Sequence, residues 1–154
     1  MKVLILGMGN PILSDDGIGL LIAEEIGKRV KGAEVVTTAL VGVHLLDLIA
    51  GYDKVFLIDA LTTVGGIKGE VVKLKDGGAT SHLFSSHGVN FFELLRLGGE
   101  LGYKMPELGR VYGIEIGDEI AFGEELSPEL KERLPCIIEK IADDVRSHLN
   151  PPCV

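Results

Sequence analysis

Two kinds of apolar pattern alternate along the chain. Short continuous apolar runs, bounded by charged residues or glycine, predict five β-strands at residues 2–6, 34–38, 54–59, 70–75 and 110–116. Between these runs, apolar residues recur at every third or fourth position, as on the buried face of a helix. This spacing predicts helices over residues 18–30, over residues 44–50, after Ser86, and over residues 128–149.

Residues that typically begin or end helices support this division. Ser127-Pro128 is a capping residue followed by proline at the first helical position. Ser86 is a similar cap, and Gly51 suits the end of the short helix over residues 44–50. Pro135 lies inside the final helix, where a proline can divide a helix into two pieces.

The order of the first elements predicts how the strands pair. Strand, helix, strand, helix and strand joined by right-handed crossovers give a parallel sheet. If the second and third strands pair on opposite sides of the first, a ligand crevice opens between the first and third strands. The strand over residues 70–75 follows the Gly65-Gly66 turn and is predicted as an antiparallel edge strand. The predicted fold class is therefore α/β, with a mostly parallel sheet of five strands.

Composition and charge narrow the class of protein. The 154 residues predict one domain over residues 1–150 and a flexible tail over residues 151–154. The net charge of −8 argues against nucleic acid as the main partner, because phosphate binding needs a basic surface. No apolar run approaches the roughly 20 residues of a membrane helix, and the first run is too short for a signal peptide. The cysteines, Cys136 and Cys153, have no metal-binding or disulfide spacing, so we expect a cytoplasmic location. The sequence has no coiled-coil seam, so we expect a monomer.

The segment from Gly7 to Gly19, GMGNPILSDDGIG, carries the most informative pattern of the chain. It connects the first strand to the first helix, where ligands bind in open α/β sheets. A dinucleotide-binding loop offers glycines and helix amides to a phosphate there, but Asp15 and Asp16 would repel a phosphate. Two carboxylates suit a metal ion or acid–base chemistry instead.

The aspartates at the predicted strand ends also have structural explanations. Asp16, or Asp15 in its place, can cap the first helix. Asp59 directly follows the apolar run over residues 55–58 and can simply begin a loop, although a buried carboxylate is costly unless it is paired. If both strands end in one crevice, Asp16 and Asp59 face a common ligand.

Three of the four histidines are candidates for completing this site. His87 begins the helix after Ser86, and a neutral imidazole is a good ligand for nickel or zinc, although a first-turn histidine can also be simply exposed. His82 lies in the same polar loop and competes for this role. His44 follows the second strand and could support the site, whereas His148 is expected to be a solvated cation at the end of the last helix.

Asp16, Asp59 and His87 would together supply three ligands and leave room for water or substrate. Catalytic metal sites have this open pattern, whereas structural zinc sites are closed by four ligands. A mixed oxygen and nitrogen set does not specify the metal. The sequence contains neither the GxSxG nor the HExxH motif of other hydrolases.

Several motifs together resemble the nickel–iron hydrogenase maturation endopeptidases. They are the Gly7 to Gly19 segment, the strand end Ile58-Asp59-Ala60, Ser86-His87, and shorter matches at residues 44–48, 52–54, 113–115 and 126–128. The resemblance covers nearly the whole chain, in order. It implies a three-layer α/β/α sandwich with a twisted sheet of five strands.

The resemblance also implies an activity, a partner and site residues. The activity is removal of a short C-terminal peptide from a hydrogenase large-subunit precursor after nickel insertion. Nickel is implied as the metal, supplied by the precursor, and zinc or cadmium could replace it in vitro. The implied metal-binding and catalytic residues are Asp16, Asp59 and His87, and the implied supporting loop residues are Gly9, Asn10, Asp15 and Gly17. Residues 39–42, ALVG, depart from the family's Gly-Gly, which bears on the choice of precursor.

Three alternatives stay open at this point. A nickel-sensing chaperone of the large subunit could use the same three ligands without cutting, and a released peptide would distinguish the two. A peptidyl-tRNA hydrolase shares the opening Gly7 to Pro11 but needs a basic surface, and a histidine where residues 14–17 read SDDG. A dinucleotide-binding domain needs an acidic ribose ligand after the second strand, where residues 37–39 read TTA.

Overall fold

The computed structural model describes residues 1–40, 42–74, 91–118 and 121–151 of the chain. This part contains the strands β1 (Val3–Met8), β2 (Glu34–Thr38), β3 (Lys54–Leu61), β4 (Val71–Leu74) and β5 (Glu107–Glu115). Its α-helices are α1 (Ile18–Arg29), α2 (Leu46–Ile49), α3 (Phe91–Glu100) and α4 (Pro128–Leu149). Two 3₁₀ helices, η1 (Ser14–Gly17) and η2 (Gly42–Leu45), precede α1 and α2.

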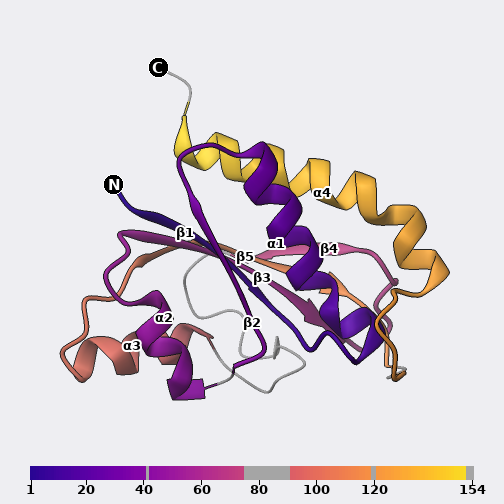
Figure 1. Cartoon of the computed structure of the whole chain (residues 1–154), viewed down its shortest axis with the longest axis horizontal. Helices are drawn as coiled ribbons and strands as arrows, with labels where there is room; N and C mark the ends of the chain where they lie inside the picture. The colour runs from indigo at the N-terminus through magenta and orange to yellow at the C-terminus, as the bar shows by residue number, and fades with distance from the viewer. Residues whose placement is uncertain (41, 75–90, 119–120, 152–154) are drawn as a thin grey trace.

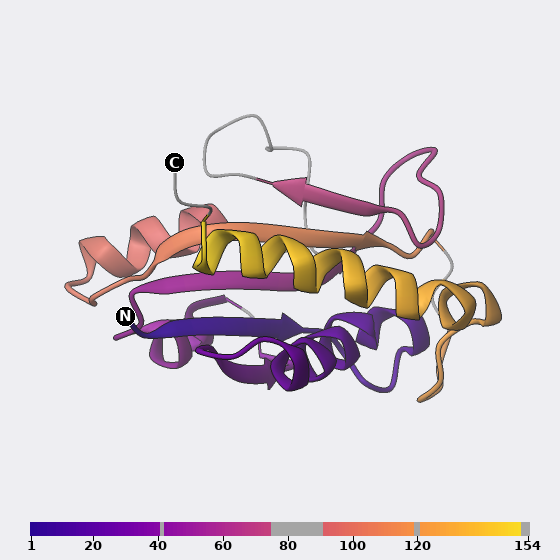
Figure 2. The same ribbon diagram turned by 90° about the horizontal axis from the view of Figure 1, so that it is seen from above.

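The strands form one sheet in the order β2-β1-β3-β5-β4. Strands β2, β1, β3 and β5 are parallel, and β4 runs antiparallel to β5 at the edge. Figure 2 shows this order, from β2 low in the view to β4 at the top. The predicted switch between the first and third strands, and the antiparallel edge strand, are therefore confirmed.

Alternating side chains of the strands divide the core into two layers. Ile5 of β1 and Phe56 of β3 are fully buried against α1 and α4, whereas Leu6 and Leu57 are buried against α2 and α3. Burying each such side chain contributes about 1.5–3 kcal/mol to stability. Figure 1 shows α4 above the sheet and α2 and α3 below it, which is the expected three-layer sandwich.

Helix α4 is one continuous helix, which corrects the expectation that Pro135 divides it. Proline removes the backbone hydrogen bond to the carbonyl of Lys131, but both residues are exposed, so water can bind that carbonyl. On the opposite side of the helix, Ile137 and Ile141 are buried in the core. Their packing holds the two halves in one helix because it outweighs one lost hydrogen bond.

The predicted helix boundaries are largely confirmed. Pro128 is the first residue of α4 and Ser127 is its N-cap in extended conformation, although the serine side chain makes no capping hydrogen bond. Gly51 adopts a left-handed φ of 88° just after α2. The Ser86 cap lies outside the described residues.

Asp144 of α4 gathers a polar network beside the core. The Tyr112 hydroxyl donates a 2.6 Å hydrogen bond to Asp144 Oδ2, and Lys73 Nζ lies 3.2 Å from Oδ1. Arg110 Nε lies 3.7 Å from Oδ2. Burial alone would raise the pKa of Asp144, but the hydrogen bonds from Tyr112 and Lys73 and the Arg110 charge together hold it below its ordinary value of 3.8.

This network predicts a measurable acid sensitivity. Because the pKa of Asp144 is lower in the folded than in the unfolded chain, its contribution to stability is complete above about pH 4 and is lost as pH falls through the folded pKa. Denaturant unfolding at pH 7 and pH 3 should therefore show a smaller acid loss for Asp144→Asn than for the wild type. The exposed Asp143→Asn, whose carboxylate pairs with Arg146, is the matched control and should leave the acid loss unchanged. Equal acid losses in Asp144→Asn and the wild type would contradict this role.

Candidate active site

The ends of β1 and β3 place the two predicted aspartates at the same edge of the sheet. The β1–β3 ladder ends with Gly7 opposite Ile58, so Asp59 lies just beyond it. Helix η1, which carries Asp16, contacts β3. Gly19 allows this packing, because a Cβ there would lie 2.4 Å from the Met8 carbonyl oxygen and 2.7 Å from that of Ile58. The chain therefore brings the Asp16 segment directly onto the two strand ends.

Asp16 is buried in η1, with 5% of its surface exposed. Its Oδ2 accepts a 3.0 Å hydrogen bond from the backbone N–H of Asn10, so the preceding loop folds back onto the carboxylate. Asp16 does not cap α1: the N-cap is Gly17, and no side chain makes a capping hydrogen bond there. The helix-cap explanation of Asp16 is therefore wrong.

Asp59 is 3% exposed and lies within β3 rather than at its end. The strand continues to Leu61 because β5 continues to offer backbone partners, with Asp59 opposite Gly113 and Leu61 opposite Glu115. The predicted strand end at residue 59 is thus two residues too early. Asp59 Oδ1 accepts a 2.8 Å hydrogen bond from the Ala60 N–H. Because the site is buried, a negative charge on this side chain would attract a cation strongly.

Asp15 fixes the loop to the rest of the molecule. It is 6% exposed, and its Oδ1 accepts a 2.6 Å hydrogen bond from the Ser127 N–H at the start of α4. Its Oδ2 lies 3.0 Å from Lys68 Nζ, which also contacts Ser127 Oγ and Glu129. The hydrogen bond to Asp15 and its negative charge raise the pKa of Lys68 against the opposing effect of burial. We call Asp15, Lys68 and Ser127 the latch.

The latch predicts a stability difference between neighbouring ion pairs. Asp15→Ala removes a partly buried ion pair and the acceptor of the Ser127 N–H, so it should lower the free energy of unfolding by about 2–3 kcal/mol. Glu25→Ala removes the exposed pair with Lys28 and should cost at most about 0.5 kcal/mol. Urea unfolding at pH 7 measures both changes. If the Asp15→Ala protein is as stable as the Glu25→Ala protein, the latch does not contribute to the free energy of unfolding.

The histidine predictions have different outcomes. His87 and its competitor His82 lie outside the described residues, and no group of three or more possible metal ligands occurs in the described part of the chain. His44 is exposed in η2, after β2. His148 is in the last turn of α4 as predicted, but its side chain is only 22% exposed and its ring packs edge-on against Phe56, with 5.8 Å between the ring centroids, so it is not solvated as expected.

Lys68 and Glu115 lie at the edge of the site but were not predicted as site residues. The sequence does not indicate the role of Lys68, because nothing in a glycine-rich turn predicts a partly buried ion pair. Glu115 is 1% exposed at the end of β5 and accepts hydrogen bonds from the Thr63 N–H and hydroxyl, which fixes the β3–β4 connection. It follows an apolar strand just as Asp59 does, so the strand-end signal could have found it.

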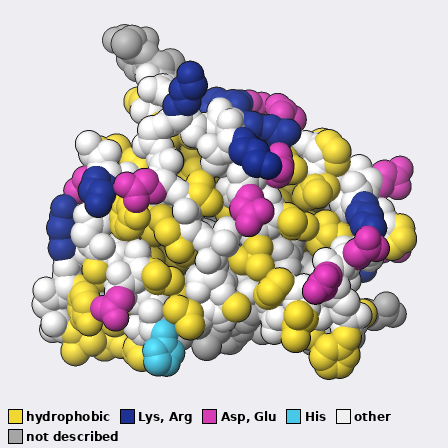
Figure 3. Space-filling model, viewed as in Figure 1, with side chains coloured by type: hydrophobic (Ala, Val, Ile, Leu, Met, Phe, Trp, Pro, Cys, Tyr) yellow, Lys and Arg dark blue, Asp and Glu magenta, His cyan; other side chains and the backbone are white. Residues whose placement is uncertain are grey.

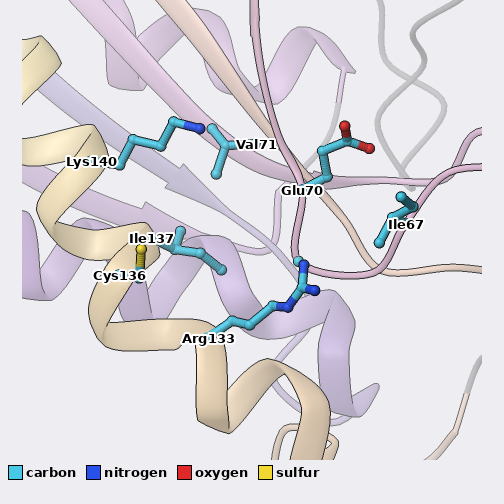
Figure 4. A pocket seen from close by; sticks show the side chains of 8 residues that line it. Ile67, Glu70, Val71, Arg133, Cys136, Ile137 and Lys140 are labelled. Atoms are coloured by element: carbon cyan, nitrogen blue, oxygen red, sulfur yellow. The ribbon is translucent and has the colours of Figure 1, made fainter.

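A hollow of about 390 Å³ lies between α4 and the β4 segment. Figure 4 shows Arg133, Cys136 and Lys140 of α4 on one side of it and Ile67 and Glu70 on the other. Of the described lining residues, Glu70 alone carries a carboxylate, and neither Asp16 nor Asp59 is among them. The exposed Cys136 therefore belongs to a different surface from the predicted acidic pair, and Cys153 lies outside the described residues.

The fold and the acidic strand ends define a doubly wound α/β protein with its candidate site at the carboxyl edge of the sheet. The chain belongs to the hydrogenase maturation protease family, whose sequence profile matches residues 20–144. The match includes Asp59 and His87 and begins after Asp16. In the described part of the chain, no helix is both long and apolar enough to cross a membrane.

Comparisons with individual proteins agree with this family. The chain is 26% identical over 145 residues to the hydrogenase expression/formation protein HupD of Thiocapsa roseopersicina, covering 90% of this chain but 65% of HupD. The hydrogenase maturating endopeptidase HybD of Escherichia coli has the same fold, with a TM-score of 0.76 over 96% of this chain and 93% of that one, at 22% identity. HybD of Thermococcus kodakarensis, a [NiFe] hydrogenase maturation protease, matches with a TM-score of 0.68 and 27% identity over 94% and 99% of the two chains.

Proposed function

We propose that this chain is an endopeptidase that removes the C-terminal extension of a nickel–iron hydrogenase large-subunit precursor after nickel insertion. Membership of the hydrogenase maturation protease family supports the reaction class. The observation that carries the proposal is the pair of buried aspartates, Asp16 and Asp59, on adjoining elements at the carboxyl edge. Two buried carboxylates at one edge of a sheet are candidates for binding a cation or for acid–base chemistry.

In this proposal, the nickel ion belongs to the substrate. Asp16, Asp59 and His87 bind a nickel ion that the precursor already holds, and so fix the scissile peptide bond at the sheet edge. A water molecule, activated by the metal or by a carboxylate, adds its oxygen to the carbonyl carbon. The C–N bond breaks, the new C-terminus keeps the oxygen, and the amine of the released peptide takes a proton.

This arrangement makes cleavage depend on the loading state of the precursor. An unloaded precursor lacks the shared ion, so it should not be held in position. Intact-mass measurement of loaded and unloaded precursor after incubation with the chain tests this dependence. Peptide loss only from the loaded precursor is expected, and equal cleavage of both would contradict recognition through nickel. Zinc or cadmium, which we propose as substitutes in vitro, would be tested in the same assay.

The second candidate is a nickel-sensing chaperone that binds the large subunit without cutting it. It uses the same three residues, and only a released peptide separates it from the peptidase. The cytoplasmic location and the monomeric state stay predictions.

A further inference from the structure

Large apolar side chains are exposed on the loops at the carboxyl edge of the sheet. The loops after β1, β3 and β5 expose Ile12 by 55%, Val64 fully, Ile67 by 61% and Phe122 by 88%. We call these four residues the apolar rim. Figure 3 shows hydrophobic side chains gathered at the lower right of the molecule, where the loops after β1 and β5 lie. The loop after β2 also exposes Leu40 and Val43.

Ile12 and Phe122 are presented together by a fixed backbone contact. Leu13 forms a parallel β-bridge with Gly123, and the Gly123 N–H donates a 2.8 Å hydrogen bond to the Ile12 carbonyl oxygen. The Ser14 N–H in turn donates to the Gly123 carbonyl oxygen at 2.8 Å. The pair therefore lies beside the segment that carries Asp16, on backbone already ordered before any partner binds.

Val64 and Ile67 are held by two anchors on the β3–β4 connection. Glu115 accepts hydrogen bonds from Thr63, directly before Val64, and Asp15 of the latch binds Lys68, directly after Ile67. The latch joins this connection to the β1 and β5 loops through Asp15 and Ser127. In Figure 2 these loops lie at the right-hand end of the molecule, with the β3–β4 connection above and the loop after β1 below. The rim thus consists of two ordered pairs at one end of the molecule, and this order before binding lowers the entropy lost on binding.

We propose that the apolar rim is the docking surface for the folded large-subunit precursor, a partner with an apolar patch bordered by basic side chains. This inference rests on the proposed function. Exposed apolar side chains that cluster around a site mark protein interaction surfaces more often than singly scattered ones do. The rim lies at the edge of the sheet that carries Asp16 and Asp59, so a protein docked there presents its scissile segment to them.

The charged side chains beside the apolar rim indicate which charges the partner should carry around its apolar patch. Exposed carboxylates flank it in sequence, with Glu124 two residues from Phe122 and Glu70 three residues from Ile67. The neighbouring bases are already engaged: Lys68 with Asp15, Lys131 with Glu125, and Arg133 with the carbonyl oxygen of Lys68. Basic side chains on the partner would complement these carboxylates. A second copy of this chain would not, because it carries the same acidic border and a net charge of −8.

The test compares matched pairs of serine substitutions. Ile12→Ser/Phe122→Ser and Val64→Ser/Ile67→Ser remove rim side chains, and Leu101→Ser/Tyr103→Ser removes exposed apolar side chains after α3. The Kd for purified nickel-loaded precursor and the kcat of its cleavage are measured for each protein, with Tm as a check on folding. Each rim variant should raise the Kd at least about tenfold and keep kcat within about twofold of the wild-type value. The control variant should have the Kd and kcat of the wild type.

The outcomes separate this inference from the proposed function. If the wild type cleaves the precursor and the rim variants bind it with unchanged Kd, the docking role of the rim is overturned and the peptidase function stands. If the wild type binds but does not cleave, weaker binding by the rim variants alone still supports the rim, while the peptidase fails. Absence of binding by the wild type overturns both. Sedimentation that shows the rim variants losing self-association, with unchanged precursor binding, would make the rim a contact between copies and overturn the proposal.

Discussion

Asp59→Asn and Asp16→Asn should each slow removal of the precursor's C-terminal peptide by about a thousandfold or more. Positioning by a metal ion and its activation of water contribute several kcal/mol to transition-state stabilisation, and each 1.4 kcal/mol is about a factor of ten. Asparagine keeps the size of the side chain but loses the charge that binds the cation. Single-turnover cleavage of nickel-loaded precursor, followed by mass spectrometry, measures the rate.

The folded state should survive these substitutions. The asparagine oxygen can still accept the hydrogen bond from the Ala60 N–H at position 59 and from the Asn10 N–H at position 16. Thermal unfolding should therefore show a cooperative transition in both variants, and Asp143→Asn on α4 should cleave at the wild-type rate. His87→Ala is expected to lose activity in the same way. A variant that cleaves normally would remove its residue from the mechanism.

Gly19→Ala should be among the most damaging glycine substitutions for stability in the described part of the chain. A Cβ at this position would overlap the carbonyl oxygens of Met8 and Ile58, which are backbone atoms fixed in the sheet. Helix α1 would have to move away from β1 and β3, at a cost of about 3 kcal/mol. For a chain of this size, Tm should fall by roughly 6–12 °C.

Gly99→Ala is the matched control, because Gly99 also lies in a helix but a Cβ there meets nothing within 4 Å. Alanine favours helix over glycine by up to about 1 kcal/mol, so this variant should be as stable as the wild type or more stable. Calorimetry of both variants measures the difference. Equal stability of Gly19→Ala and the wild type would disprove the close packing of α1 on the strand ends.

Periodic patterns predicted most of the fold because each strand and helix buries one defined face. β2 has the predicted bounds, and the strand order follows from right-handed crossovers. The boundaries that differ depend on neighbours that are distant in sequence. β3 extends past Asp59 only because β5 is long enough to pair with it, and Pro135 is accommodated only because the buried face of α4 packs on the sheet.

The candidate site was predictable where its signal is local and not where it depends on tertiary contacts. A carboxylate after a buried strand identified Asp59, and the loop motif identified Asp16. The role of Asp15 was not predictable, since its partners Ser127 and Lys68 lie far along the chain. Neither was the apolar rim, because exposure of Ile12 or Phe122 cannot be derived from a hydrophobic pattern that otherwise indicates burial.

The central claim is that the carboxyl edge with Asp16 and Asp59 cuts a hydrogenase large-subunit precursor. The most direct test is the intact mass of nickel-loaded precursor after incubation with the wild-type chain and, in parallel, with Asp59→Asn. The account predicts that the wild type releases one C-terminal peptide and that the precursor stays intact with the variant. A precursor that stays intact with the wild-type chain while forming a stable complex with it would contradict the claim and favour the chaperone.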